Sequence, residues 1–517
     1  MSGSETRRGG RSGRAGRTAA AGGALAQKPF RQPRRRFPPL ELVSADELEA
    51  IHQASLTILE EIGMDFLNEE ARDLLRAAGA EVAQDGPRVR FDRGLIERAL
   101  ASCPAECTLH ARNPAHHLRF GADHLIFAQV ASAPNSQDAA GGRRPGNRED
   151  FRNFLRLAQH FNIIHMSCGY PVEPVDLHPS TRHLDCLADI VRLTDKPFGA
   201  YSLGRARILD AIEIARIARG IDAATLEREP SVSTIVNSSS PLRLDDPMLV
   251  GMMEMARRNQ MVIITPFTLA GAMAPVTIAG ALAQQNAEAL AGLAFLQLVR
   301  PGAPVGYGGF TSNVDMKSGA PAFGTPEYMK AAVIGGQLAR RYRVPYRSSN
   351  TCAANTVDAQ AAYESVFSLW GAVMGGANLV MHAAGWLEGG LSASFEKTIL
   401  DVDLLQMVAE FLDPLAIDEA SLALEAVREV GPGGHYFGAA HTRARYRDAF
   451  YAPLLSDWRN HESWREAGSP TAMTKATQLW RETLAGCEAP PLDPAIAEEL
   501  DAFVARRKQE GGFKTDF

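Results

Sequence analysis

A long stretch without any charged side chain, residues 259–287, most constrains how this chain can fold. On hydropathy alone it could pass for a membrane span, which needs ~20 apolar residues. Pro266 and Pro275 interrupt the stretch, however, and residues 284–286 are polar amides. We therefore interpret it as a buried strand, a loop and a buried helix that Pro275 opens. A strand free of polar residues that leads into a long helix is one unit of a parallel α/β fold, because such strands are covered on both faces.

The same strand-then-helix unit recurs eight times. The strand-like runs begin at His124, Asn162, Pro197, Ser231, Met261, Pro304, Pro345 and Asn378. Their starts lie roughly 30 to 43 residues apart, which is the size of one strand–loop–helix–loop unit. Helix start signals such as Asn147 and Ser394 and stop signals such as Gly220 mark the intervening helices. Eight consecutive units predict an α/β fold, a (β/α)8 TIM barrel, over residues 122–412.

Smaller parts are predicted on both sides of the barrel. Residues 38–121 contain two amphipathic helices, then short strands around one more helix, which indicates an N-terminal α+β module. Residues 413–517 do not continue the repeat. They are aromatic-rich and then helical, and we expect a C-terminal helical extension wrapped over the barrel, with its aromatic residues packed on the outer helices.

The first 37 residues differ in composition from the rest. Residues 1–37 hold ten Lys or Arg and one Glu, whereas the whole chain has a formal net charge of -6, so the body is acidic. Rich in Arg, Gly and Ala, this tail predicts disorder. A nucleic-acid-binding tail or an organellar presequence are the alternatives to a solvated extension, and we favour the solvated extension. Nucleic acid and membrane are not expected as partners.

Cysteine usage indicates the compartment. Six cysteines are scattered over a long chain and no secretory signal is visible, which predicts a reducing, cytoplasmic location rather than a disulfide scaffold. Cys103 and Cys107 form a lone pair without a second pair, so we predict no bound metal.

The active site of a TIM barrel lies at the carboxyl ends of its strands, so those positions supply the candidates. They lack a Schiff-base lysine, a carboxylate pair, a metal-ligand pattern and a Gly-rich phosphate loop. Small hydroxyls, amides and aromatics occupy them instead. The predicted substrate-binding residues here are Tyr201, Tyr307, Phe310, Arg347, Asn350 and Trp386, and Ser132, Cys168, Ser202, Asn237 and Phe267 lie at such ends as well.

A neutral, aromatic pocket in an acidic protein suits a permanent cation held by cation–π contacts. A quaternary ammonium already has a neutral amine as its leaving group. Methyl transfer from it to an anionic nucleophile therefore needs in-line positioning and a dry site rather than an acid or a base. The alternative is that the aromatics only fill the core.

Three polar residues have alternative roles. His382 could orient substrate or cofactor, or be a structural histidine. Glu388 could be the counter-ion of a substrate cation, or accept hydrogen bonds from a helix N-terminus. We predict His382 and Glu388 as the catalytic residues. Arg347 could bind a substrate carboxylate through two hydrogen bonds, or pair with a neighbouring acid.

Long blocks of the sequence resemble the trimethylamine methyltransferase (MttB) superfamily. They include DLHPSTRHLDCLADIVRLTDKPF, APVTIAGALAQQNAEALAGLAFLQLVRPGAPVGYGGF, SGAPAFGTPEYMKAA, ANLVMHAAGWLEGGLSASFEK and VGPGGHYFGAAHT, and the resemblance extends from residue 40 to residue 494. It implies a barrel enzyme that transfers a methyl group from an amine to the Co(I) form of a corrinoid (cobalamin). It also implies that a separate, cognate protein carries this corrinoid.

The founding trimethylamine enzymes of that superfamily use pyrrolysine, whereas this chain is written in the standard twenty residues. It therefore resembles the branch without pyrrolysine, whose members demethylate quaternary amines such as glycine betaine. The GGHYF segment also recurs in the family. From it we expect His435 and Tyr436, together with His441, to lie near the barrel mouth and shape the pocket or the corrinoid-protein surface.

Three functional hypotheses follow. The first is a methyltransferase that moves a methyl group from a quaternary or tertiary methylamine, such as glycine betaine, to a corrinoid protein. The second keeps the fold but uses another N-methyl donor or another acceptor. The third is a quaternary-ammonium-binding sensor without turnover, because barrels host many functions. A homo-oligomer is expected in each case.

Overall fold

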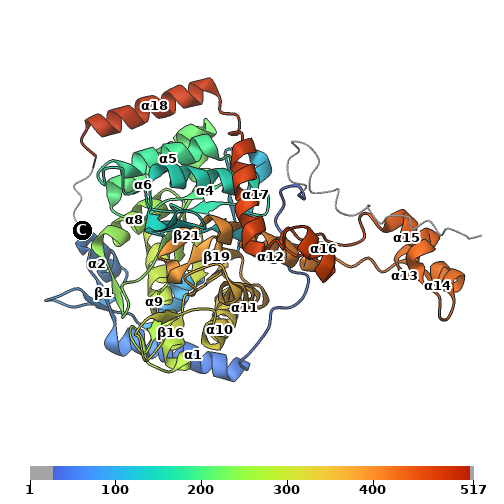
Figure 1. Ribbon diagram of the computed structural model, residues 1–517. Helices are drawn as coiled ribbons and strands as arrows, with labels where there is room; N and C mark the ends of the chain where they lie inside the picture. The colour runs from blue at the N-terminus through green and yellow to red at the C-terminus, as the bar shows by residue number, and fades with distance from the viewer. Residues whose placement is uncertain (1–26, 513–517) are drawn as a thin grey trace, which may run out of the picture.

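The computed structural model describes residues 27–512, and its centre is a barrel of eight parallel strands (Figure 1). In sheet order the strands are β6 (Ile126–Gln129), β19 (Leu379–Ala384), β18 (Tyr346–Ser349), β15 (Val305–Gly308), β13 (Met261–Ile264), β11 (Val232–Val236), β10 (Phe198–Gly199) and β9 (Ser167–Cys168). A parallel bridge between Ala128 and Met166 joins the first strand to the last and closes the barrel. The predicted (β/α)8 fold is confirmed, and each strand lies in the run that predicted it.

A helix follows every barrel strand and covers its outer side. These helices are α4 (Arg148–His160), α5 (Arg182–Leu193), α6 (Arg205–Arg219), α8 (Asp246–Arg257), α9 (Ile278–Val299), α10 (Pro326–Tyr342), α11 (Ala359–Gly375) and α12 (Phe395–Leu412), with a short α7 (Ala223–Arg228) before β11. Side chains cap several of them as the sequence indicates. Asn147 accepts a hydrogen bond from Asp150 N and Ser394 accepts one from Lys397 N.

Helix α9, which begins in the charge-free stretch, is buried almost all round. Its outer side is covered by α1 (Ala45–Thr57) and α3 (Arg93–Leu100) of the N-terminal module. A helix that is apolar on every face needs such a cover, which explains why this stretch carries no charge. The helix begins at Ile278 rather than at Pro275, because the Thr277 hydroxyl caps it by accepting from Gly280 N.

The N-terminal module is tied to the barrel by a shared sheet. Its other elements are η1 (Ile58–Ile62), β1 (Met64–Phe66), α2 (Glu69–Ala77), β2 (Glu81–Val82), β3 (Arg88–Arg90), β4 (Cys107–Leu109), η2 (Pro114–His116) and β5 (Leu118–Phe120). Strand β12 (Arg243–Leu244), from the loop after β11, pairs with β1 in the order β12-β1-β3-β2. The module thus packs directly on the loop that leaves the fourth barrel strand.

Residues 27–37 differ from the disorder that their composition predicts. His165 Nε2 donates to the Arg31 carbonyl at 3.0 Å, and the Phe30 ring lies 4.2 Å from the His116 ring. Arg31 also forms an ion pair with Asp413. The basic side chains of this segment therefore find acidic partners on the barrel, which composition alone does not reveal. The rest of the predicted tail, residues 1–26, lies outside the described residues.

The C-terminal part wraps the barrel only in its second half. There α17 (Ala472–Gly486) packs on α12 and α4, and α18 (Pro494–Gln509) packs on α5 and α6. Before them, residues 414–450 project from the body and carry α13 (Glu419–Leu422), α14 (Leu424–Val430), η4 (Tyr436–Gly438) and α15 (Ala440–Arg445), while α16 (His461–Glu466) follows near the body (Figure 1). For residues 414–450 the expectation of a wrapped extension is wrong, because this segment projects from the body and its large apolar side chains are exposed.

Short strands extend the loops at the carboxyl ends of the barrel. One small sheet contains β20 (Trp386–Leu387), β21 (Ser392–Ser394), β7 (Asn135–Asp138) and β8 (Gly142–Pro145), and η3 (Glu388–Gly390) lies within it. Another contains β14 (Leu269–Ala270), β16 (Ser312–Val314) and β17 (Pro321–Ala322). No helix in the described part of the chain is both long and apolar enough to cross a membrane.

Candidate active site

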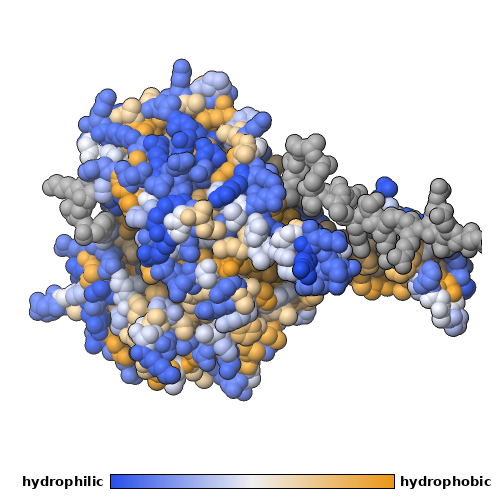
Figure 2. Space-filling model, viewed as in Figure 1, coloured by the Kyte–Doolittle hydropathy of each residue, from blue (hydrophilic) through white to orange (hydrophobic). Residues whose placement is uncertain are grey.

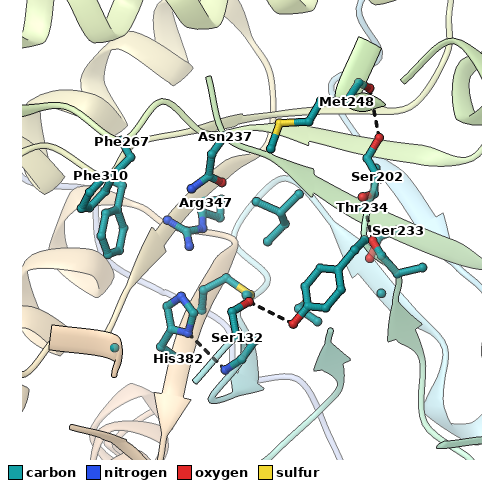
Figure 3. Close-up of a pocket in the computed structure, with 18 of the residues that line it drawn as sticks. Ser132, Ser202, Ser233, Thr234, Asn237, Met248, Phe267, Phe310, Arg347 and His382 are labelled. Atoms are coloured by element: carbon teal, nitrogen blue, oxygen red, sulfur yellow. Dashed lines mark hydrogen bonds between the residues drawn. The ribbon is translucent and has the colours of Figure 1, made fainter. Parts of the chain in front are cut away.

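A cavity of about 390 Å³ opens at the carboxyl ends of the barrel strands (Figure 3). All eight strands or the loops after them contribute to it, as expected for this fold. The lining residues are Ala131, Ser132, Cys168, Gly199, Ala200, Tyr201, Ser202, Leu203, Ser233, Thr234, Ile235, Asn237, Met248, Phe267, Phe310, Arg347, Met381, His382, Trp386, Gly389 and Gly390.

Arg347 on β18 is the charged residue of this lining, and its guanidinium lies in the cavity between Asn237 and His382 (Figure 3). Only 4% of the residue is exposed, yet neither Nε nor Nη1 has a hydrogen-bond partner in the structure. Burial lowers the pKa of the guanidinium to about 10, so it remains protonated at neutral pH. A buried cation with two free donors is a strong site for an anion, above all a carboxylate.

Aromatic rings form much of the remaining wall. The Phe267 and Phe310 rings lie 5.1 Å apart, and the Phe310 ring meets the Trp386 ring edge-on at 5.9 Å. On the opposite side, the Tyr201 hydroxyl bonds the Ser132 hydroxyl at 3.0 Å and accepts from a backbone N–H. Burial raises the pKa of Tyr201, so it remains a phenol. Such rings can contact a cationic methylammonium group through their faces.

His382 is held as a neutral imidazole against Trp386. Its Nδ1 accepts from Ala131 N at 3.3 Å, which leaves the ring proton on Nε2. Burial and the nearby Arg347 lower the pKa of His382 well below its usual value. The ring stacks on the Trp386 ring at 4.7 Å. Its backbone φ of 53° is unusual for a residue other than glycine and is a mark of functional sites.

The site contains no acid and no thiolate at neutral pH. Among the described residues that line the cavity none is Asp or Glu. Burial raises the pKa of Cys168 to about 12, which keeps it a thiol. In the described part of the chain, no cluster of three or more His, Cys, Asp or Glu side chains is arranged to hold a metal ion. The lining can therefore bind, orient and exclude water, and it has one fixed positive charge.

Glycine is required where Trp386 crosses the backbone. Gly390 has a φ of 100°, and a Cβ at this position would lie 2.6 Å from the indole Nε1. The missing side chain lets the indole lie flat against the loop, where it forms part of the cavity wall.

The structure brings five of the ten predicted site residues into the cavity, namely Tyr201, Phe310, Arg347, His382 and Trp386. Tyr307 does not line it. The Tyr307 ring is fully buried, and its hydroxyl bonds Gln285 at 3.2 Å and Asn286 at 3.1 Å on α9. Alternate residues of a strand face opposite sides, so Tyr307 points outward to the helices.

Asn350 also points away from the cavity. Its Nδ2 donates to the Ala383 carbonyl at 3.1 Å and to Asp401 Oδ1 at 3.3 Å. Asp401 Oδ2 accepts from Gly385 N at 2.8 Å, and Asp401 Oδ1 forms a fully buried ion pair with Lys397 at 2.5 Å. This network fixes the backbone between His382 and Trp386, so Asn350 supports the site from behind.

Glu388, predicted as catalytic, lies at the rim without lining the cavity. Its Oε2 accepts from Arg143 Nε at 2.7 Å and from Ser392 Oγ at 2.6 Å, so its carboxylate already has partners. His435 and Tyr436 lie on the projecting segment and are exposed, away from the mouth of their own barrel (Figure 1). Within one chain, the structure does not bring these three residues to the site.

Several lining residues were not predicted. Ser233 and Ile235 lie inside strand β11, four and two residues before Asn237, and all three line the cavity. Their period of two could have identified them from Asn237. Met248 comes from the start of α8 and Met381 from the interior of β19, and no sequence signal distinguishes them from core residues.

Comparisons with known proteins agree with one another. The model of the family described as Trimethylamine methyltransferase (MTTB) matches residues 7–512. A glycine betaine methyltransferase from Desulfitobacterium hafniense (strain Y51) is 37% identical over 477 residues, 92% of this chain and 99% of that protein. A trimethylamine methyltransferase MttB from D. hafniense (strain DSM 10664 / DCB-2) is 27% identical over 91% of this chain and 94% of its own length.

One solved structure, described as the crystal structure of the hydroxylamine MtmB complex, aligns with a TM-score of 0.47 at 10% identity. The alignment covers 85% of this chain and 92% of that chain.

Proposed function

Because the chain belongs to the trimethylamine methyltransferase (MTTB) family, we propose that it transfers a methyl group from a zwitterionic quaternary amine, such as glycine betaine, to the Co(I) corrinoid of a partner protein. The resemblance found in the sequence is confirmed, and the chain is a methyltransferase of this family. The donor, the acceptor and the residues that bind them are the proposal.

We choose a betaine as the methyl donor because the guanidinium of Arg347 has unpaired hydrogen-bond donors. A simple quaternary cation would be repelled by it, because no Asp or Glu among the described lining residues offsets the charge. A betaine carries a carboxylate beside its ammonium group. That carboxylate accepts hydrogen bonds from the two free donors of Arg347, while the trimethylammonium group lies against Tyr201 and Trp386.

The reaction needs no general acid or base. The bond between a methyl carbon and the quaternary nitrogen breaks, its electron pair remains on nitrogen, and a neutral tertiary amine leaves. The methyl carbon forms a bond to the electron pair of the acceptor, which is the Co(I) centre of the substrate corrinoid. A lining without acids and with a neutral His382 matches this requirement.

The chain's residues contribute by orientation. Arg347 on β18 binds the carboxylate end of the donor, and Tyr201 and Trp386 contact its trimethylammonium end, which directs one methyl group to the open end of the cavity. The His382 ring stacks on Trp386 by its face, and its in-plane Nε2–H can donate a hydrogen bond to the second carboxylate oxygen. The aromatic wall excludes water from the methyl group.

Two other functions remain as alternatives. A methyltransferase with another N-methyl donor would retain the aromatic wall, and its donor would lack the carboxylate. A betaine-binding sensor would retain both the aromatic wall and the carboxylate contact at Arg347, and it would not transfer a methyl group.

A donor panel separates these functions. The protein is mixed anaerobically with free cob(I)alamin and with glycine betaine, carnitine, proline betaine, choline or trimethylamine, and loss of the Co(I) absorption is followed. We expect methylcobalamin with a betaine and little with choline, which has the same ammonium group but no carboxylate. Turnover with choline or trimethylamine alone would contradict the assignment of the donor. Calorimetric binding of a betaine without turnover would support the sensor.

Replacing Arg347 tests the carboxylate contact. Charge-assisted hydrogen bonds contribute ~1.5–3 kcal/mol, so Arg347→Met is expected to lower kcat/KM for glycine betaine roughly 10- to 100-fold. Arg98→Met, at an exposed position of the N-terminal module, is the matched control and should leave kcat/KM unchanged. The ratio of betaine to choline binding, measured by calorimetry, should fall only in Arg347→Met. An equal loss for both ligands would show that Arg347 is merely structural.

A further inference from the structure

Residues 414–450, which we call the arm, leave the body of the molecule and return to it (Figure 1). Both ends are fixed. Before the arm, Asp413 forms an ion pair with Lys28 at 2.9 Å, and after it Tyr451 Oη donates to Asp403 Oδ1 at 2.9 Å. Among the described residues, the arm's own hydrogen bonds join only residues of the arm, for example His441 Nε2 and the Ala420 carbonyl. The arm is therefore held at its base and has little contact with its own barrel.

The arm is apolar where a solvent-exposed segment should be polar. Its exposed large apolar residues are Leu415, Ile417, Leu422, Leu424, Val427, Tyr436, Phe437, Tyr446 and Phe450. Phe437 and Phe450 are each 89% exposed. The helices of the arm have four, seven and six residues, too short to be stable in water by themselves. Such a segment needs a surface that covers it.

A second apolar surface lies on the body at the base of the arm. We call it the α11–α12 patch, and it consists of Tyr363, Val366, Phe367, Met407 and Phe411. The positions on each helix are three or four residues apart, so each set forms one stripe. Trp370 joins the stripes, because its ring meets the Phe411 ring at 5.0 Å. Figure 2 shows hydrophobic residues gathered on the body beside and below the base of the arm.

Charge is divided along the arm. The half with α13 and α14 is acidic, with Asp418, Glu419, Glu425 and Glu429 against Arg428. The half with α15 is basic, with Arg443, Arg445 and Arg447 against Asp448. Charge therefore favours a two-fold arrangement in which the acidic half of each arm lies beside the basic half of the other. The arm is thus complementary to a second copy of itself.

We propose that the arm and the α11–α12 patch form the interface of a homodimer. A two-fold arrangement uses the same surface on both copies, so each arm meets its counterpart and reaches the patch of the other body. With roughly 100 Å² for each of its nine exposed apolar side chains, the arm offers on the order of 900 Å² per copy, against the ~800 Å² of a stable interface. The sequence predicted a homo-oligomer without identifying the surface, and this inference goes beyond the proposed methyl transfer.

Measuring the oligomeric state tests whether the exposed apolar residues of the arm form the proposed interface. The full chain is analysed by light scattering after size exclusion and by sedimentation velocity between 1 and 50 µM, a range set on the order of common dimer affinities. We expect a dimer or a higher even-numbered oligomer. Phe437→Asp with Phe450→Asp should weaken the dimer at least tenfold, whereas the exposed Ile62→Asp on the N-terminal module is the control and should not. A monomeric wild-type chain, or an oligomer unchanged by the Phe variants, would overturn the proposal.

Charge reversal identifies the partner as a second arm. Glu425→Arg with Glu429→Arg makes both halves of the arm basic, and Arg443→Glu with Arg445→Glu makes both acidic. Each variant alone should dimerise at least tenfold more weakly, because like charges meet. An equal mixture of the two should form a heterodimer, visible when one variant carries a size tag. If mixing does not restore association, the arm binds a different partner and the proposal is wrong. Circular dichroism and melting temperature confirm that each variant is folded.

Discussion

At the scale of single residues, Arg347 is a charged side chain that is buried with two of its hydrogen-bond donors unpaired. Removing a guanidinium from water without a partner for Nε and Nη1 is costly, and the face of Phe310, 5.2 Å away, offsets part of this cost. In the proposed function a bound carboxylate would recover this cost, so the buried charge would raise affinity for an anionic group. His382 beside it stays neutral and adds no second positive charge.

The titration of Arg347 predicts how binding depends on pH. Carboxylate binding needs the protonated guanidinium, whose pKa is lowered to about 10, so affinity for glycine betaine should be constant near neutral pH and fall as pH rises through about 10. A bound carboxylate raises the pKa of the guanidinium in the complex, so the fall begins near the pKa of the free protein and continues to higher pH. Calorimetry from neutral pH to above pH 10 measures the affinity for glycine betaine. Choline is the control, because it has no carboxylate and its affinity should not fall. A loss of betaine affinity below pH 8 would show that another group controls binding.

At the scale of elements, the turn after β19 owes its shape to α12. Asp401 accepts from Gly385 N and pairs with Lys397, and both side chains are fully buried. Burial raises the pKa of Asp401, while Lys397 and the Gly385 N–H favour its charged form. The pair therefore holds the segment that carries His382 and Trp386.

Breaking this pair should be costly. Asp401→Asn leaves Lys397 as a buried cation without a counter-ion and is expected to lower the free energy of unfolding by about 3–5 kcal/mol. Urea denaturation measures the loss. Adding Lys397→Met removes the cation while the Asn oxygen still accepts from Gly385 N, so the double variant should recover part of the stability. No recovery would mean that the unpaired Lys397 cation is not the cause of the loss. Asp46→Asn, on the exposed surface of α1, is the control.

At the scale of the whole molecule, residues 27–37 close the amino end of the barrel. The Phe30 ring covers the buried Lys196 ammonium at 5.6 Å, and that ammonium donates to three backbone carbonyls, among them Ile164 O at 2.6 Å. Burial lowers the pKa of Lys196 to about 7. A segment with a tail's composition thus completes the core.

Deleting this segment tests its contribution. A chain that begins at residue 38 should lose about 2 kcal/mol or more of stability, because the apolar contacts of Phe30 and several ion pairs disappear. Differential scanning calorimetry compares it with a chain that begins at residue 27, which retains all of these contacts. Equal melting temperatures would show that the segment only rests on the surface.

The sequence by itself determined the barrel, the order of its eight units and the family. Each unit is local, since an apolar run followed by a capped helix can be read within about 30 residues. It also placed part of the site, because strand ends converge in this fold. That argument identified five residues that line the cavity, Arg347, His382, Phe310, Tyr201 and Trp386, and their roles remain a proposal.

Only the tertiary structure decided which face each side chain takes and which segments meet. Tyr307 and Phe310 are three residues apart, yet the pleat turns one to α9 and the other to the cavity. Glu388 forms an ion pair with Arg143, which is distant in sequence, and does not line the cavity. The arm reads as an ordinary aromatic extension until its side chains are found exposed. These outcomes depend on contacts between residues far apart along the chain, which local patterns do not encode.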